Sequence, residues 1–237
     1  MEFDSILYLI FNTLGFVSLF ISIFLVNKKY KVLSFEYLVY SYMLFIMGFI
    51  IFAKVFHVIM SYEALSNIMD SMVEFLKFIF SGYTFLGGII GGVLALFLFS
   101  QISDIKFKSI LLLYAPSMLL MYSVMKIGCF FMGCCQGING INIQLVESLL
   151  NMIGYFVIIR FLNTKNTLIY YSGLLFGILR FGVSFFRVYP NRISFMFVQI
   201  ICYGLVFWGL YGLIYEKSNK KKEKLCKKGW YFIFFII

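Results

Sequence analysis

The stretch Ser109–Met132, SILLLYAPSMLLMYSVMKIGCFFM, carries a single formally charged side chain, Lys126. A helix needs about 20 mostly apolar residues to cross the hydrocarbon core of a bilayer, and this stretch is long enough. Over the whole chain, hydrophobic residues make up 62% of 237 positions and charged residues 13%, whereas soluble domains have about 25% charged residues. The sequence therefore predicts an all-α, polytopic membrane helical bundle.

Six further apolar stretches bring the number of predicted membrane spans to seven. The segment Leu65–Phe80 is amphipathic and too short to span, so we predict an interfacial or re-entrant helix there. The apolar end, Trp230–Ile237, is also too short and is expected in the interface. We expect one transmembrane domain over residues 1–216 and a basic cytoplasmic tail over 217–237. The seven predicted spans are Ser5–Val26, Tyr37–Met60, Tyr83–Ile102, Ser109–Met132, Ile143–Leu162, Leu168–Phe186 and Ile193–Tyr215.

Lysine and arginine are unevenly distributed between the two sets of loops. One set, together with the tail, holds fourteen of these residues, and the other set holds three. Because lysine and arginine are enriched in cytoplasmic loops, we predict a cytoplasmic C-terminus and an N-terminus outside. The same placement argues against nucleic acid as a partner, although the formal net charge is +10. We expect a multi-pass protein of the plasma membrane.

Four predicted spans carry polar or ionisable side chains at helical spacing. Residues three, four or seven positions apart share a helix face, so each set forms a stripe. Such groups are costly in contact with lipid, and we expect the stripes to face one another around a polar cavity. The stripes are Lys54 and His57; Lys126, Cys129 and Gly133; Gln144, Glu147 and Asn151; and Arg180, Ser184 and Arg187.

The predicted cavity has an excess of positive charge. Lys54, Lys126, Arg180 and Arg187 are cations, and Glu147 is the one clear carboxylate among the stripes. Such an excess favours an anionic ligand. In a membrane the abundant anion is a lipid phosphate, which arginine binds through its planar fork and lysine as a point charge.

Simpler interpretations remain open for several of these residues. Lys54 could extend to a headgroup, and Arg187 could anchor the end of its span at the interface. His57 could be an ordinary hydrogen-bonded side chain. Glu147 could pair with a cation for structural reasons alone.

Glycines and cysteines add two further signals. The pairs Gly87-Gly88 and Gly91-Gly92 favour close helix packing, while a second interpretation places a ligand against this backbone. The simplest interpretation of Cys129, Cys134 and Cys135 is three inert, buried residues. The alternatives are a redox pair, or a transient thioether or thioester between lipid and Cys129 or Cys134. Adjacent cysteines rarely ligate one metal, and the single histidine lies on another helix, so we expect no metal and no cofactor.

The order of motifs resembles the prolipoprotein diacylglyceryl transferase family over nearly the whole chain after the first span. The segment Gly128–Gly137, GCFFMGCCQG, resembles a divergent branch of that family. Five segments carry the resemblance: Phe52–His57 to Gly-x-Arg-x-x-Tyr, Tyr83–Gly91 to Ser-Phe-His-Gly-Gly-Leu-x-Gly, Pro116–Gly137 to Pro…Gly-Arg-x-Gly-Asn-Phe-x-x-Gly-Glu, Ile143–Glu147 to Pro-x-Gln-Leu-Tyr-Glu, and Gly173–Arg187 to Gly-x-x-x-x-x-Tyr-x-x-x-Arg-x-x-x-Glu-x-x-Arg.

The resemblance implies roles for individual residues. Arg180, Arg187, Gln144 and Glu147 match the family's residues, while Lys126 and Lys54 stand where the family has arginines. Leu86 replaces a histidine proposed as proton acceptor, Cys129 replaces an asparagine, and Cys134 and Ser184 replace glutamates. We predict catalytic roles for Lys126, Arg180 and Glu147. Substrate binding is predicted for Lys54, His57, Gly87, Gly88, Gly128, Cys129, Gln144 and Arg187.

The implied activity is transfer of a diacylglyceryl group from phosphatidylglycerol, or another anionic phospholipid, to the cysteine thiol of a prolipoprotein or peptide. The departing glycerol phosphate is an anion that needs electrostatic stabilisation rather than a metal. The alternative is a non-catalytic or differently specific membrane protein that binds an anionic lipid or solute in the same cavity.

The predicted topology can be tested with fusion reporters. A reporter placed after Tyr30 or Lys108, or at the C-terminus, is expected to read as cytoplasmic, because these positions lie on the lysine-rich side. An extracellular reading after Tyr30 or Lys108 would show that the orientation is reversed.

Overall fold

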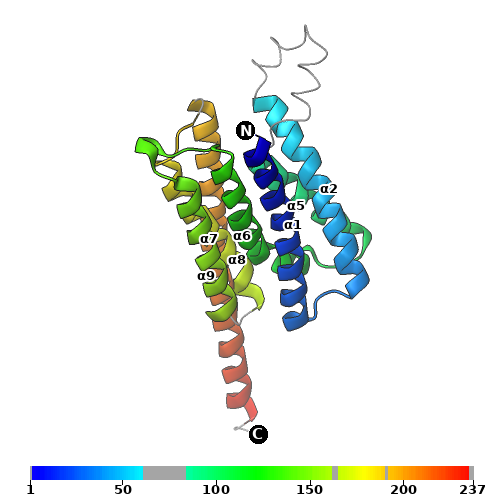
Figure 1. The fold of residues 1–237 in the computed structure, drawn as a ribbon. Helices are drawn as coiled ribbons and strands as arrows, with labels where there is room; N and C mark the ends of the chain where they lie inside the picture. Colours follow the sequence, from blue (N-terminus) through cyan, green and yellow to red (C-terminus); the bar gives the residue numbers. More distant parts are fainter. Residues whose placement is uncertain (1, 61–83, 162–164, 190–191, 235–237) are drawn as a thin grey trace. The chain divides into compact units, whose positions relative to one another are not determined.

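The structure, a computed structural model, describes residues 2–60, 84–161, 165–189 and 192–234 (Figure 1). Apart from the short 3-10 turn Ile138–Gly140, the regular elements in these ranges are α-helices. They are α1 Glu2–Tyr30, α2 Phe35–Met60, α5 Phe85–Ile102, α6 Phe107–Phe131, α7 Ile143–Phe161, α8 Lys165–Ser184 and α9 Arg192–Phe234.

Seven helices in the described part of the chain are long and apolar enough to cross a membrane, which confirms the predicted number of spans. The helices begin and end within a few residues of the predicted bounds, except that α9 continues as one helix far beyond Tyr215. Residues 217–234 of the predicted tail therefore continue the last helix. The predicted interfacial segment Leu65–Phe80 lies outside the described residues.

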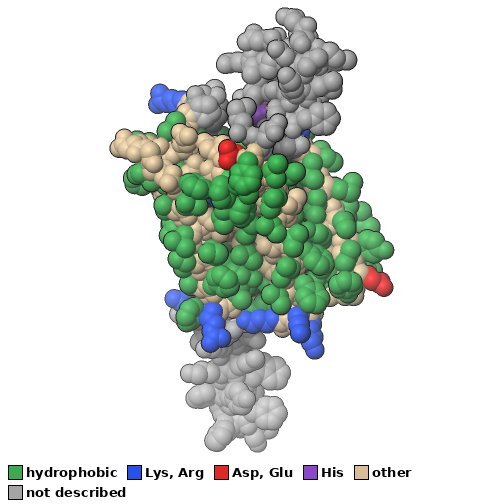
Figure 2. Space-filling view, in the orientation of Figure 1, with side chains coloured by type: hydrophobic (Ala, Val, Ile, Leu, Met, Phe, Trp, Pro, Cys, Tyr) green, Lys and Arg blue, Asp and Glu red, His purple; other side chains and the backbone are tan. Residues whose placement is uncertain are grey.

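The distribution of side chains is that of a membrane protein. Large apolar side chains such as Leu9, Phe156 and Phe207 are exposed, while charged side chains such as Lys126 and Glu147 are buried. Hydrophobic side chains cover most of the face drawn in Figure 2. Because lipid is as apolar as leucine, this arrangement leaves the polar groups to be satisfied inside the protein.

The chain divides into two compact units, one formed by Met1–Ser18 with Ala115–Ile237 and the other by Leu19–Tyr114. In the unit Leu19–Tyr114, α2 packs on α5. A Cβ added at Gly48 would lie 2.5 Å from the carbonyl oxygen of Gly91, so the two backbones are in close contact. Gly87 and Gly88 are covered by Phe56 and Phe49 of α2. These contacts support the packing interpretation of the glycine pairs.

Lys54 and His57 belong to the same unit. Both lie half-buried near the end of α2, one helical turn apart. The start of α5 is hydrogen-bonded beside them, because the Thr84 N–H donates to the carbonyl oxygen of Ala53 at 3.0 Å. The start of the glycine-rich helix therefore lies next to the residue that precedes Lys54.

In the unit that contains Ala115–Ile237, small residues bring pairs of helices together. Ser123 of α6 and Ser148 of α7 each donate a hydroxyl proton to the other's carbonyl oxygen, at 2.7 and 2.8 Å. Helix α8 packs on α9, where a Cβ at Gly177 would lie 3.1 Å from the Cys202 carbonyl oxygen. Small residues at such crossings are typical of membrane helix pairs, in which van der Waals contact and interhelical hydrogen bonds drive association.

Packing of α8 on α9 predicts unequal effects of two substitutions on the same helix. A Cβ at Gly209 would lie 2.9 Å from the Tyr170 carbonyl oxygen, whereas nothing lies within 4 Å of one at Gly204. We expect Gly209→Leu to destabilise the protein by about 1–3 kcal/mol, the usual cost of overpacking. Gly204→Leu is the matched control and should leave the thermal midpoint in detergent within error; equal losses in both variants would contradict this packing.

Candidate functional site

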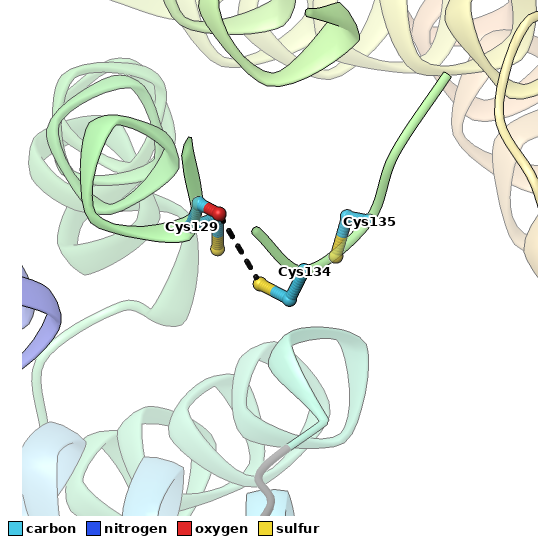
Figure 3. A group of neighbouring side chains, drawn as sticks. All are labelled: Cys129, Cys134 and Cys135. Carbon is cyan, nitrogen blue, oxygen red and sulfur yellow. Dashed lines mark hydrogen bonds between the residues drawn. The ribbon is translucent and has the colours of Figure 1, made fainter. Parts of the chain in front are cut away.

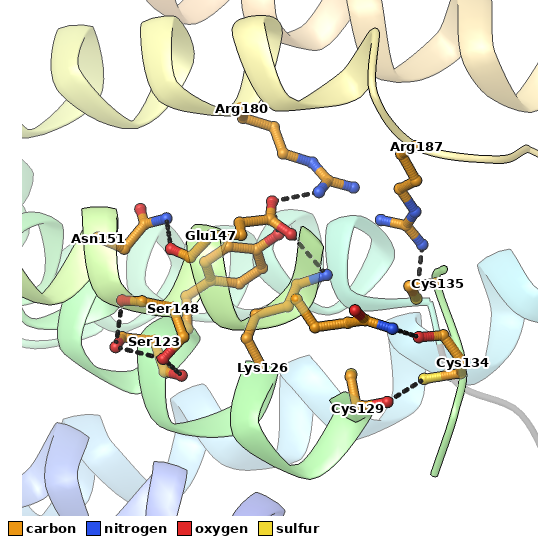
Figure 4. A network of polar contacts seen from close by, with 12 residues as sticks. Ser123, Lys126, Cys129, Cys134, Cys135, Glu147, Ser148, Asn151, Arg180 and Arg187 are labelled. Atoms are coloured by element: carbon orange, nitrogen blue, oxygen red, sulfur yellow. Dashed lines mark hydrogen bonds and ion pairs between the residues drawn. The ribbon is translucent and has the colours of Figure 1, made fainter. Parts of the chain in front are cut away.

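A buried carboxylate, Glu147 of α7, lies at the centre of a charged cluster (Figure 4). Its Oε2 is 2.9 Å from the Lys126 Nζ of α6, and its Oε1 accepts hydrogen bonds from the Arg180 guanidinium of α8 and the Tyr122 hydroxyl of α6. Lys126, Glu147 and Arg180 are 5%, 1% and 6% exposed, respectively. We refer to Tyr122, Lys126, Glu147 and Arg180 as the charged cluster.

The predicted stripes on α6, α7 and α8 therefore do face one another. Gln144, Glu147 and Asn151 are all buried along one face of α7, as their spacing indicated. Tyr122 lies one turn before Lys126, on the same face of α6. Since one helix supplies the carboxylate and two others supply the cations, the three helices must pack together before the charges can pair.

The pairing leaves less free positive charge than the sequence suggested. Glu147 neutralises one of its two cations, so the charged cluster keeps a net charge of +1. Lys126 and Arg180 also lie over the Tyr122 ring, 5.1 and 5.9 Å from its centroid. Cation–π contacts of this kind add to the stability of the buried charges.

Tyr122 was not among the predicted site residues. It occupies the position one turn before Lys126, and that spacing was the available signal. Its aromatic ring gave no reason to distinguish it from the many apolar residues of the span. The structure assigns it two roles, because its hydroxyl donates to Glu147 while its ring faces both cations.

A loop between α6 and α7 lies beside the charged cluster and is attached to the segment that follows α8. Helix α6 ends at Phe131, and Gly133 follows with a positive φ of 66°, which fits the predicted helix end. Gly137 forms a β-bridge with Arg187, and the Val188 N–H donates to the Gln136 carbonyl oxygen at 2.9 Å. The loop thus has a defined path, although it contains no α-helix.

Gln144 and Arg187 hold this loop from two sides. The Gln144 side chain donates to the Cys134 carbonyl oxygen at 2.7 Å, and Arg187 Nη2 donates to Cys135 Sγ at 2.7 Å. Arg187 lies beyond the end of α8 and is half-buried. Both predicted substrate-binding residues therefore form hydrogen bonds to the loop between α6 and α7, here called the cysteine loop.

Cys129, Cys134 and Cys135 form a cluster in which the three sulfur atoms lie within 4.8 Å of one another (Figure 3). The Cys134 thiol donates to the Cys129 carbonyl oxygen at 3.5 Å. Hydrogen bonds from the thiols of Cys129 and Cys134 hold the pKa of Cys135 well below its usual range, and Lys126 and Arg187 act in the same direction. The fold therefore brings together three thiols whose spacing in the sequence had argued against a shared metal ion.

Several buried polar atoms near these groups have no hydrogen-bond partner within the described part of the protein. Arg187 Nε and the Tyr189 hydroxyl are two such donors. Burial raises the pKa of Tyr189, so its hydroxyl keeps its proton and can donate. Because buried polar groups are nearly always satisfied, unpaired donors beside a positive cluster indicate a place for a polar or anionic ligand. The unpaired acceptors are Gln144 Oε1, Asn151 Oδ1 and Gln199 Oε1.

The other predicted site residues have different surroundings. Gly128 faces α1, where an added Cβ would lie 2.9 Å from the Phe11 Cβ. Lys54, His57, Gly87 and Gly88 belong to the unit Leu19–Tyr114, which is described by itself. Their participation in the same site stays a prediction.

Comparison with known proteins identifies relatives over most of the chain. The sequence pattern of the prolipoprotein diacylglyceryl transferase family matches residues 3–215. A phosphatidylglycerol–prolipoprotein diacylglyceryl transferase of Dehalococcoides mccartyi is 31% identical over 130 residues, which are 55% of this chain and 48% of the relative. The enzyme of the same name from Clostridium tetani is 34% identical over 92 residues, covering 39% of this chain and 35% of the relative.

A third relative matches a longer segment at lower identity. The phosphatidylglycerol–prolipoprotein diacylglyceryl transferase of Chlorobaculum tepidum is 26% identical over 175 residues, or 63% of this chain and 61% of the relative. The D. mccartyi alignment covers about half the length of that relative. The match to the family pattern is broader than any of these three alignments, and it includes all the residues of the charged cluster.

Removal of the central carboxylate should be more harmful than removal of one cation. Glu147→Gln leaves Lys126 and Arg180 buried without a counter-charge, and breaking a buried pair in this way typically costs about 3–5 kcal/mol. Lys126→Met still leaves Glu147 paired with Arg180, so it should cost clearly less. Unfolding of both variants in mixed micelles measures the difference, and a Glu147→Gln protein as stable as Lys126→Met would contradict a central role for the carboxylate.

Proposed function

Because the chain belongs to the prolipoprotein diacylglyceryl transferase family, we propose that it transfers a diacylglyceryl group from phosphatidylglycerol to a cysteine thiol of a prolipoprotein or peptide. The observation that carries this proposal is the buried cluster of Lys126, Glu147 and Arg180 at positions that match the family's motifs. The exposed apolar helices are consistent with a lipid substrate that reaches the site from the bilayer. The acceptor and the bacterial-type plasma membrane are parts of the same proposal.

The proposed reaction is a displacement at a glyceryl carbon. The acceptor sulfur forms a bond to that carbon, the carbon–oxygen bond to the phosphate breaks, and glycerol phosphate leaves with the electron pair. The departing group is an anion, so preorganised positive charge lowers the barrier. The net +1 charge of the cluster and the unpaired donors Arg187 Nε and Tyr189 Oη supply that environment.

Glu147 acts as a positioning residue in this proposal. Lys126 of α6 and Arg180 of α8 both bind its carboxylate, and this fixes their side chains before substrate arrives. A phosphate that approaches Lys126 and Arg180 shares them with Glu147 and needs no large rearrangement of the helices. Fixed charges of this kind stabilise a transition state more effectively than mobile ones, because they do not have to reorganise during the reaction.

The alternative is a protein that binds an anionic lipid or solute without turnover. The specific observation in its favour is that Lys126 and Arg180 already have a protein counter-charge. Leu86 in place of the family's histidine also removes a possible proton acceptor. A direct transfer assay separates the two functions, since both predict binding of phosphatidylglycerol and only one predicts a lipid-modified thiol.

Transfer of labelled lipid from phosphatidylglycerol to a cysteine-containing acceptor peptide tests the proposal. Lys126→Ala should lower the rate on the order of 100-fold or more, because it removes a charge that faces the leaving group. Lys126→Arg should retain transfer, whereas Arg180→Lys should not, because the cluster would lose its only planar fork. Arg160→Ala is the matched control, since Arg160 is exposed at the far end of α7.

Two results would contradict the proposal. Full transfer by Lys126→Ala would exclude this lysine as a leaving-group contact. Binding of phosphatidylglycerol by the wild-type protein with no lipid on any cysteine-containing acceptor would favour the non-catalytic alternative.

A further inference from the structure

We propose that Cys129, Cys134 and Cys135 form a zinc site with three thiolate ligands and an open fourth position that binds the acceptor thiol. The inference rests on the proposed function for the identity of the fourth ligand. The metal site itself rests on the cysteine cluster alone, whose three sulfur atoms lie within 4.8 Å of one another. It departs from our sequence-based expectation of no metal, because the fold brings the two adjacent cysteines and Cys129 together.

The separation of the sulfur atoms is close to what zinc requires. A zinc–sulfur bond of about 2.3 Å in tetrahedral geometry places two sulfur ligands roughly 3.8 Å apart. The sulfurs of the cysteine cluster therefore need to approach by no more than about 1 Å. Two of them belong to the loop between α6 and α7, and side-chain rotation with a small loop movement accomplishes this.

The backbone explains how adjacent cysteines can serve one ion. In an extended chain, neighbouring side chains point to opposite sides. Cys135 instead has a φ of 64°, and Gly133 has a φ of 66°. A left-handed conformation is uncommon for a residue with a Cβ, because the Cβ then lies too close to the following carbonyl oxygen. Such strain is typical of functional sites, and here it turns the Cys134 and Cys135 sulfurs toward Cys129.

The surroundings supply the outer contacts of a metal site. Three thiolates and a divalent ion have a net charge of −1, which the Arg187 guanidinium at Cys135 Sγ offsets. Gln144 holds the Cys134 backbone through its carbonyl oxygen. Hydrogen bonds of this kind orient the ligands of metal sites and adjust their charge. In the proposed site, Arg187 would offset the charge of the ligands and Gln144 would hold the backbone of one of them.

The chemistry of the ligands selects zinc. Thiolates favour thiophilic ions such as zinc, copper(I) and iron in clusters, and zinc adds no redox chemistry. Zinc sites that act on substrates keep three protein ligands and one open position. The proposed zinc site lies next to the charged cluster, because Cys129 is one helical turn after Lys126 on α6. A thiol bound at the zinc ion would therefore lie near the cations that receive the leaving group.

Zinc binding would activate the acceptor thiol. Leu86, which replaces the family's histidine, cannot do so because it has no group that accepts a proton. On coordination the acceptor thiol loses its proton to water, because a metal-bound thiol is deprotonated. The zinc-bound sulfur then attacks the glyceryl carbon as the carbon–oxygen bond breaks and glycerol phosphate departs. The product is a thioether, a neutral and weak ligand, which leaves the zinc ion in its original oxidation state.

The metal content of the purified full-length protein is the first test, made without lipid or acceptor. We expect about one zinc per chain after purification with zinc and without chelator. Cys129→Ser, Cys134→Ser and Cys135→Ser should each lower zinc retention at least ~10-fold, as loss of a ligand weakens a site of three. Cys202→Ser is the matched control, because Cys202 is buried on α9 and is absent from the cysteine cluster.

Cobalt(II) substitution tests the ligands without relying on variants that could misfold. Cobalt in wild-type protein should show sulfur-to-metal charge-transfer absorption and the visible bands of a tetrahedral ion. A peptide with an acceptor cysteine should alter these bands, whereas the same peptide with serine should not. Wild-type protein that retains neither zinc nor cobalt, that retains copper or iron instead, or that has a disulfide within the cysteine cluster when freshly purified would overturn the zinc site. Cobalt absorption bands that do not change when the cysteine peptide is added would overturn the open fourth position.

The transfer assay separates failure of this inference from failure of the proposed function. Chelator-treated protein should lose transfer and regain it with zinc. Transfer at the full rate by metal-free protein would overturn the role of zinc and leave the transferase function in place. A protein that binds zinc and whose cobalt bands respond to the cysteine peptide, but that transfers no lipid, would support the site while contradicting the proposed transferase function.

Discussion

The structure of the polar site depends on one constraint, which is that charges buried among membrane helices must be neutralised by other parts of the protein. Glu147 meets this requirement for Lys126 and Arg180 at once, and the Tyr122 hydroxyl donates a further hydrogen bond to its carboxylate. Because the four residues come from three helices, their pairing also selects how α6, α7 and α8 face one another. The carboxylate therefore contributes to the packing of the three helices, whatever its part in catalysis.

The same constraint explains why much of the fold could be predicted from the sequence. A bilayer leaves long apolar helices as one of few ways to satisfy the backbone, so the seven spans follow from the lengths of apolar stretches. Polar residues at helical spacing must then face inward, which is why the stripes of Lys126, Glu147 and Arg180 meet. The family motifs also point to Gln144 and Arg187 as substrate-binding residues; this stays a prediction, and in the structure both contact the cysteine loop.

What the sequence could not reveal depends on side-chain pairing and on irregular backbone. The count of cations suggested a strong excess of positive charge, but it could not show that one carboxylate serves two of them. Tyr122 resembles the many aromatic residues around it until its hydroxyl and ring are seen in place. The cysteine cluster depends on a left-handed residue at Cys135, and no periodic pattern predicts such a turn.

Two of the departures from the family's motifs lie close together in the structure. Glu147 and Arg180, which match the family's residues, belong to the charged cluster, and Gln144 lies on the same buried face of α7 as Glu147. Cys129 and Cys134, which replace an amide and a carboxylate, lie together with Cys135 within 4.8 Å. Ser184 replaces another carboxylate, and its hydroxyl accepts a hydrogen bond from Gln199 at 2.6 Å. Both cysteine replacements introduce a thiol, one at the end of α6 and one in the loop that follows it, and so alter a single chemical property at one place. In the proposed reaction, Glu147 and Arg180 would keep the leaving-group side of the site close to the family's motifs, while the cysteines would supply sulfur on the nucleophile side.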